Sequence, residues 1–97
     1  MKNINYLHDE STEFPYSIEF DFSLKDFRGM KSLVRMVGDS LKIQNMVISS
    51  ELRDFLNKNT NEYLSNFYDT DIPYIKKLII SFKNKDEAIF FKLSWLK

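Results

Sequence analysis

The stretch FPYSIEFDF, residues 14–22, places aromatic or β-branched side chains at every second position, with polar residues and one proline between them. A period of two residues is typical of a β-strand with one buried face and one face in water. Glu19 and Asp21 make the wet face acidic, which discourages edge-to-edge pairing with other chains. The pattern therefore predicts a half-buried strand near 14–22.

A helix is predicted to follow over about 24–42. Ser23 is placed as its cap, with Asp26 three residues further on. Apolar side chains then recur every three or four residues, as on one face of a helix, at Phe27, Met30, Val34, Val37 and Leu41. Its basic flank consists of Arg28, Lys31, Arg35 and Lys42. Gly29 and Gly38 each disfavour a helix interior by ~1 kcal/mol, so a break at either glycine is an alternative.

In the middle of the chain, the sequence leaves the secondary structure of one segment open and predicts a helix for the next. Residues 43–48 fit a short strand, a continuation of the preceding helix or a linker. Ser49 or Ser50 offers a cap for a second helix near 50–67. Its helical spacing runs through Leu52, Phe55, Leu56, Tyr63, Leu64 and Phe67. The segment 69–73 predicts a turn, because it contains two aspartates and Pro73.

The last quarter of the chain predicts a strand and a final element of two alternative forms. Leu78, Ile80 and Phe82 alternate within a strand over 74–83. Residues 85–95 fit either a helix or a hairpin strand. A cap at Asn84 and acidic residues in the first turn favour the helix. The hairpin strand would place Ile89, Phe91, Leu93 and Trp95 on one face.

These elements predict the α+β fold class. The strands are too few for a doubly wound parallel sheet, and no glycine-rich turn follows the first one. A small antiparallel sheet packed by helices is the natural layering. The 97 residues fit one domain, which we expect over 14–97, with a mobile arm over 1–13.

Composition bears on where the chain works. It contains no cysteine, which excludes disulfides and cysteine-ligated zinc and suits a reducing cytoplasm. The N-terminus is polar and acidic, unlike an apolar signal peptide. No apolar run approaches the ~20 residues that cross a membrane. We therefore expect a cytoplasmic protein without membrane contact.

The residues needed for common catalytic chemistry are missing. His8 is the only histidine, it lies in the predicted arm, and no G-x-S-x-G motif occurs. Asp69 and Asp71 have a spacing found in calcium loops, but the glycine and distal glutamate of such loops are absent. No P-loop or G-x-G-x-x-G motif is present. The expectation is a protein that is not an enzyme and needs no metal or cofactor.

Charge is divided into four blocks although the net charge is zero. Residues 1–22 hold one basic and five acidic side chains, and 23–42 hold five basic and two acidic ones. Residues 43–73 are again acidic, and 74–97 are basic, with six lysines against two acids. The division fits either oppositely charged elements packed together or a polarised surface that steers a charged partner.

These charges and the apolar C-terminal segment indicate a candidate partner surface. It comprises Arg28, Lys31, Arg35, Lys42, Phe90, Lys92 and Trp95. The primary hypothesis is a protein–protein interaction module, with a homodimer as one form of it, because apolar residues beside lysines suit a protein interface. The alternative hypothesis is a nucleic-acid-binding regulator that uses the basic flank of helix 24–42.

Residues 82–95, FKNKDEAIFFKLSW, carry a resemblance to known proteins. A strand-final aromatic residue, a polar acidic turn, an alanine and a Phe-Lys-Leu-x-aromatic ending make the segment similar to one in small tailed-bacteriophage proteins. The resemblance implies a phage or mobile-element origin and no defined activity. With that origin, the interaction module would be an inhibitor or regulator of a host protein, acting in the host cytoplasm.

Overall fold

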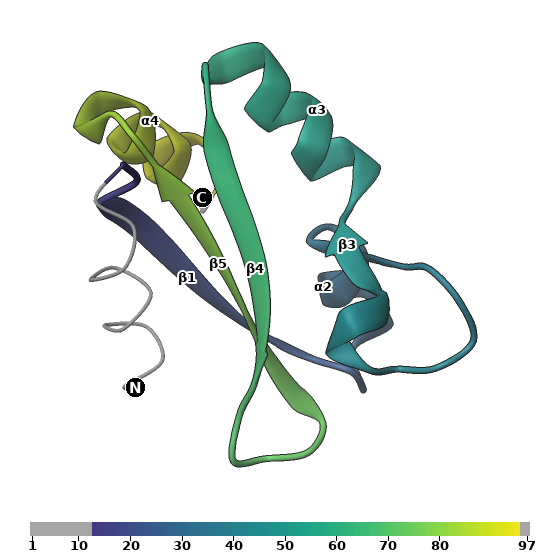
Figure 1. Cartoon of the computed structure of the whole chain (residues 1–97). Helices are drawn as coiled ribbons and strands as arrows, with labels where there is room; N and C mark the ends of the chain where they lie inside the picture. Colours follow the sequence, from purple (N-terminus) through teal and green to yellow (C-terminus); the bar gives the residue numbers. More distant parts are fainter. Residues whose placement is uncertain (1–12, 96–97) are drawn as a thin grey trace.

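The structure is a computed structural model, and it describes residues 13–95. Its main sheet has three antiparallel strands in the order β1-β5-β4 (Figure 1). These strands are β1 (Tyr16–Ser23), β4 (Tyr63–Asp69) and β5 (Ile75–Phe82). The strands predicted near 14–22 and 74–83 are thereby confirmed as β1 and β5. The arm predicted over 1–13 lies outside the described residues, apart from Glu13.

The register of the sheet places core side chains on one face, and an ion-paired lysine together with the buried Ile79 on the other. Phe20 pairs with Leu78, and Leu78 pairs with Phe67 on the other side of β5. These side chains belong to the hydrophobic core or pack against it, as the alternation in the sequence predicts. On the opposite face, Lys77 forms ion pairs with Glu19 and Asp21 of β1.

The helix predicted over 24–42 is wrong in its length. Only α2 (Phe27–Lys31) is helical, and the chain then enters β2 (Val34–Met36), which pairs with β3 (Met46–Ile48) in a separate two-stranded sheet. Val34 is buried opposite Ile48, whereas three members of the predicted helical stripe are exposed: Phe27, Val37 and Leu41. Gly38 has a φ of 105°, in the region that favours glycine, and bends the chain after β2. The strand pairing therefore prevails over the helical spacing.

The open assignment over 43–48 resolves into two short elements. A 3₁₀ turn, η1 (Ile43–Asn45), leads into strand β3, so the strand alternative holds for the last three residues of the segment. The amide N–H of Val37 donates to the carbonyl of Asn45, which ties the connection back to the end of β2.

The helix predicted near 50–67 is also shorter than expected. It is α3 (Ser50–Asn59), capped by Ser49, and residues 63–69 form strand β4 instead. The side chains of Asn59 and Thr60 donate to carbonyls of the last helical turn, at 2.9 and 2.7 Å, and compete with further helix. Tyr63 and Phe67 lie four residues apart, a spacing that a helix and a strand both place on one face. The periodicity therefore could not show where the helix ends.

The final element is helix α4 (Lys85–Trp95), so the helix alternative for 85–95 is correct and the hairpin strand is not. Asn84 Oδ1 accepts a hydrogen bond from the Asp86 amide at 2.8 Å, as a residue at a helix start does. Ala88 and Phe91 are buried in the core. The ring of Phe91 lies 5.8 Å from that of Phe20 and 5.5 Å from that of Phe82.

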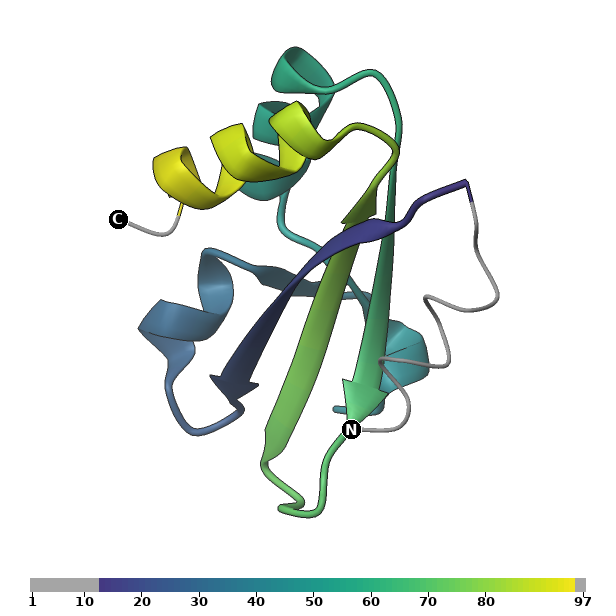
Figure 2. The ribbon, with the colours of Figure 1, turned by 90° about the vertical axis from the view of Figure 1, so that its left-hand side faces the viewer.

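The helices lie on one side of the main sheet. Figure 2 shows α4 and α2 on the same side, near opposite ends of the strands. One core cluster joins the main sheet, the small sheet, α3 and α4, and this arrangement confirms the α+β class. Within residues 13–95, no helix has the length and apolar character required to cross a membrane.

Candidate functional site

The outer face of α4 is the most apolar exposed helix surface that the structure describes. One face of this helix enters the core through Ala88 and Phe91. Away from the core, Ile89 is 46% exposed, Phe90 48% and Leu93 67%. A soluble helix of this kind normally carries polar side chains on its outer face. The face is therefore a candidate for contact with another macromolecule.

Two aromatic residues predicted for the partner surface have different roles. Phe90 stacks on Phe55 of α3, with ring centroids 6.2 Å apart and planes 9° from parallel, yet about half of it stays exposed. Trp95 is half-buried and packs against the core, 5.2 Å from the Phe55 ring. Phe90 thus belongs to the outer surface, whereas Trp95 mainly fixes the end of α4 against α3.

A groove of about 370 Å³ runs between α4 and the first half of β1. Its lining comprises Pro15, Tyr16, Ser17, Ile18, Lys85, Ala88, Ile89 and Lys92. Lys85 and Lys92 stand on either side of Ile89 along the helix, and neither forms an ion pair with another described residue. The lysines of β5 and its end differ, because Lys76, Lys77 and Lys83 each pair with an acid. The groove therefore presents apolar surface between two lysines that have no acidic partner among residues 13–95.

The four basic residues of the predicted helix flank do not form a helix flank. Arg28 and Lys31 lie on α2, Arg35 lies on β2, and Lys42 precedes η1. All four are exposed and lack ion pairs within residues 13–95. α2 lies at the far end of the helical side from α4 (Figure 2), so this basic group is separate from Phe90 and Lys92. The residues that were predicted to form one partner surface therefore lie on two separate surfaces.

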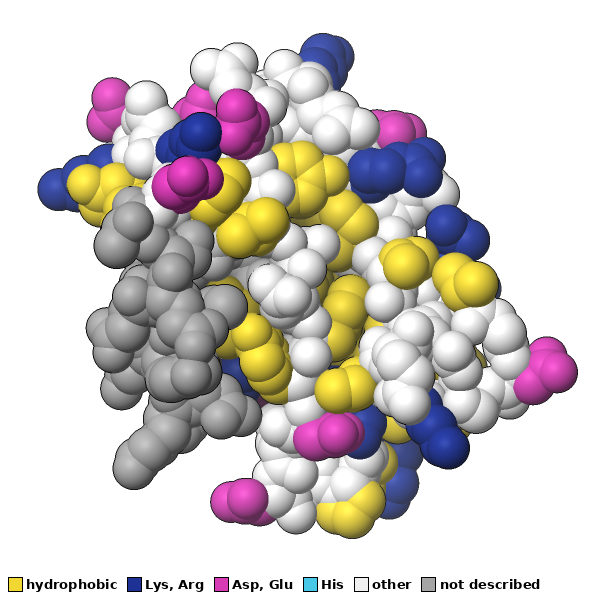
Figure 3. Space-filling view, viewed as in Figure 1, with side chains coloured by type: hydrophobic (Ala, Val, Ile, Leu, Met, Phe, Trp, Pro, Cys, Tyr) yellow, Lys and Arg dark blue, Asp and Glu magenta, His cyan; other side chains and the backbone are white. Residues whose placement is uncertain are grey.

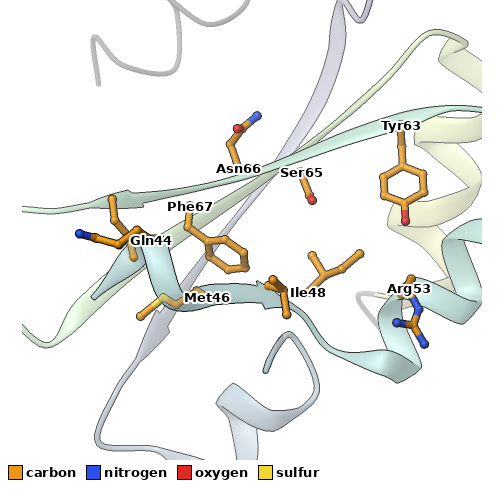
Figure 4. Close-up of a pocket in the computed structure, with 10 residues that line it drawn as sticks. Gln44, Met46, Ile48, Arg53, Tyr63, Ser65, Asn66 and Phe67 are labelled. Carbon is orange, nitrogen blue, oxygen red and sulfur yellow. The ribbon is translucent and has the colours of Figure 1, made fainter. Parts of the chain in front are cut away.

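A larger hollow, of about 620 Å³, lies between β4 and the segment of η1 and β3 (Figure 4). Tyr63, Ser65 and Phe67 project from β4 toward β3, while Arg53 reaches the hollow from α3. The Tyr63 hydroxyl donates to Asn57 Oδ1 at 3.4 Å. Burial raises the pKa of Tyr63, and the positive charge of Arg53 acts in the opposite direction. Figure 3, from the side shown in Figure 1, displays apolar side chains in the middle of this face.

The described linings of these two hollows contain no carboxylate, histidine or cysteine side chain. The polar groups of the larger one are hydroxyls, side-chain amides and the Arg53 guanidinium. In the described part of the chain, no three His, Asp or Glu side chains come close enough to hold a metal ion. His8 lies outside the described residues.

Sequence reasoning missed the groove between β1 and α4, although its signal is present. Lys85, Ile89 and Lys92 are spaced by four and three residues, so a helix places them on one side. The signal becomes visible only once 85–95 is assigned as a helix. The hollow beside β4 had no such signal, because it depends on a strand that was predicted as helix.

Comparison with protein-family models, curated proteins and solved structures finds no match to this chain.

Proposed function

We propose that this chain is a non-enzymatic protein-binding module whose contact surface is the outer face of α4. The observation that carries the proposal is the exposure of Ile89, Phe90 and Leu93 on one short helix. Single exposed apolar residues are common, but neighbouring ones on one element typify interaction surfaces. Lys92 beside them supplies the polar rim that such interfaces usually have.

A finer proposal concerns the origin and the partner. The resemblance of residues 82–95 to small tailed-phage proteins supports an inhibitor or regulator of a host protein, acting in the host cytoplasm. The helix that carries the exposed apolar residues lies within this segment. The segment of resemblance and the candidate surface therefore coincide.

Nucleic-acid binding is the weaker alternative. It required one continuous helix over 24–42 with a basic flank, whereas α2 has five residues and the basic side chains lie on three different elements. A recognition helix in a nucleic-acid groove needs its contacting residues on one helix face. The protein-binding proposal is therefore preferred.

A site-specific photo-crosslinking experiment tests the proposal. A photoreactive amino acid is placed at position 93 and, as a control, at Lys58, an exposed position on α3. In cells of the host, position 93 should yield a discrete crosslinked protein that the control does not. The purified partner should then bind Leu93→Glu at least ~10-fold more weakly than wild type and bind Lys58→Glu normally.

The opposite results would refute the proposal. They are equal crosslinking from both positions, or unchanged affinity of the Leu93→Glu variant when its circular dichroism shows a native fold. Crosslinking of position 93 to another copy of the chain, with a dimer in sedimentation experiments, would support self-association as the form of binding.

A further inference from the structure

The larger hollow, between β4 and β3, has the size of a small-molecule site. Its volume of about 620 Å³ lies within the range of ~300–1,000 Å³ that is common for ligand pockets. Its lining comes from η1, β3, α3 and β4, so the fold brings together segments that are separate in the sequence. None of the described lining residues belongs to α4. The hollow is therefore a second candidate site, apart from the outer face of α4.

The walls of the hollow are apolar over most of their length. Phe67 projects from β4 toward β3, and Met46 and Ile48 lie on the β3 side (Figure 4). The Phe67 ring is held edge-on against the core ring of Phe22, with centroids 6.0 Å apart. Val47 also lines the hollow and is 37% exposed. A fixed aromatic ring and a thioether suit the flat apolar body of a ligand.

One end of the hollow is polar and positively charged. Figure 4 shows Tyr63 and Arg53 at the same end, away from Phe67, with Ser65 next along β4. Burial raises the pKa of Tyr63, and the charge of Arg53 opposes this rise, so the guanidinium acts electrostatically on the hydroxyl. The hydrogen bond of this hydroxyl to Asn57 Oδ1 is long, at 3.4 Å, so the hydroxyl can turn to another acceptor. These donors suit a carboxylate.

The charge of the lining selects the kind of anion. Arg53 is the one cation among the described lining residues, which include no acid. Its ion pair with the neighbouring Asp54, at 3.6 Å, is exposed and therefore weak, which leaves the guanidinium available. One guanidinium matches the single charge of a carboxylate and can bind it with two hydrogen bonds. A phosphate monoester carries about −1.5 to −2 charges and would be incompletely compensated.

We propose that the hollow between β4 and β3 binds a small aromatic monocarboxylic acid. The ring of the ligand would lie between Phe67 and Met46, and its carboxylate would accept hydrogen bonds from Arg53 and Tyr63. Tyr63 and Phe67 are four residues apart on β4, which corresponds to about 13 Å along a strand. A short chain must therefore join the ring to the carboxylate, as in indole-3-butyrate. The inference goes beyond the proposed function, because it assigns a small-molecule ligand to a second site.

A free acid fits the hollow better than a peptide segment of a protein partner. The lining requires an aromatic ring and a carboxylate in one ligand, and no protein side chain carries both. A peptide could supply them only from two side chains or from an aromatic C-terminal residue, at a greater cost of ordering. An acetylated Gly-Gly-Phe tripeptide with a free C-terminus is the probe for this alternative.

Calorimetric titration of the intact protein tests the proposal. Indole-3-butyrate should bind saturably, with one molecule per chain. Indole-3-butyramide has the same ring but no charge, and butyrate has the charge but no ring. Each of these two should bind at least ~10-fold more weakly, because it leaves one end of the hollow without its partner. The acetylated tripeptide should also bind more weakly than the free acid.

Two substitutions with matched controls locate the site. Arg53→Gln removes the charge and should weaken indole-3-butyrate binding at least ~10-fold, whereas Lys58→Gln, on the same helix but outside the lining, should leave it unchanged. Val47→Glu places a carboxylate in the hollow and should weaken binding as strongly. Val37→Glu, at an exposed position outside the lining, is its control. Circular dichroism checks that each variant is folded.

Several results would overturn the inference. They are the lack of saturable binding of indole-3-butyrate, equal affinity for its amide, tighter binding of the tripeptide, or unchanged affinity in Arg53→Gln and Val47→Glu. If one variant fails to fold, the other variant and the comparison of acid with amide on wild type still decide. Crosslinking from position 93 probes a different surface, so any of these failures leaves the proposed function standing.

Discussion

At the scale of single residues, Ser49 connects two parts of the chain that are distant in the sequence. Its hydroxyl accepts a hydrogen bond from the Leu52 amide at 3.1 Å, which caps α3, and donates to the Ser32 carbonyl at 2.9 Å. The side chain is buried between the end of α2 and the start of α3. Ser50, the other cap that the sequence allowed, is exposed and lies inside the helix.

Substitution of these two serines should therefore have unequal effects. Ser49→Ala removes the cap and leaves the Ser32 carbonyl without its bond, so the free energy of unfolding should fall by about 1–2 kcal/mol. Ser50→Ala should change it by less than ~0.5 kcal/mol. Urea denaturation followed by circular dichroism measures both values. Equal losses would show that the cap is not where the structure places it.

Tyr63 should make stability depend on pH in the alkaline range. Burial raises its pKa above the ordinary value of 10.0, so the folded state holds the phenolic proton more tightly than the unfolded state. The stabilisation is complete below the unfolded pKa and is lost as the pH rises through the folded pKa. Tyr63→Phe should consequently lose less stability than wild type between about pH 9 and pH 11.

Urea titrations of both proteins at several pH values measure this difference. Lys83, whose pKa is raised by its hydrogen bond to Glu62, titrates in the same sense in both proteins and cancels in the comparison. Parallel pH profiles would contradict the assignment to Tyr63.

At the scale of elements, α4 has one structural face and one free face. Phe91 is fully buried against rings from β1, β5 and α3, whereas Leu93 is mostly exposed. Phe91→Ala should lower the free energy of unfolding by about 3–5 kcal/mol, because it removes a large core side chain. Leu93→Lys should change it by less than ~0.5 kcal/mol.

Chemical denaturation of the two variants checks this division of the helix. A large loss from Leu93→Lys would mean that Leu93 serves the fold, and the case for α4 as a contact surface would fail.

At the scale of the whole molecule, the two sheets share one core. Val34 and Ile48 of the small sheet belong to the same buried cluster as Leu78 and Phe82 of the main sheet. The domain should therefore unfold in one cooperative step. Trp95, the only tryptophan, reports on the packing of α4 against α3, while circular dichroism reports on all elements.

The urea transitions from tryptophan fluorescence and from circular dichroism should have the same midpoint and the same slope. Two separated transitions would show that the segment from α2 to β3 folds apart from the main sheet.

The sequence predicted the elements whose local signals agree with one another. β1 and β5 alternate strictly, and the caps Ser49 and Asn84 mark the starts of α3 and α4. The predictions failed where one spacing fits two structures. Tyr63 and Phe67 suit a strand as well as a helix, and Met30 and Val34 are both buried although only the first is helical.

The features of the candidate site also divide into those that the sequence could indicate and those that it could not. The exposed apolar residues of α4 could be anticipated, since either form of 85–95 leaves some of them outside. The groove beside β1 could not, because it needs the packing of α4 against a strand more than sixty residues earlier in the chain.

By itself, the sequence determined the α+β class, the two alternating strands and the absence of cysteine chemistry, because these follow from local pattern and composition. Tertiary structure alone decided where α2 and α3 end and which of the described lysines are paired. The physical reason is that these features depend on contacts between distant segments, such as Val34 with Ile48 and Lys77 with Glu19. Burial and charge compensation there outweigh local helix preference.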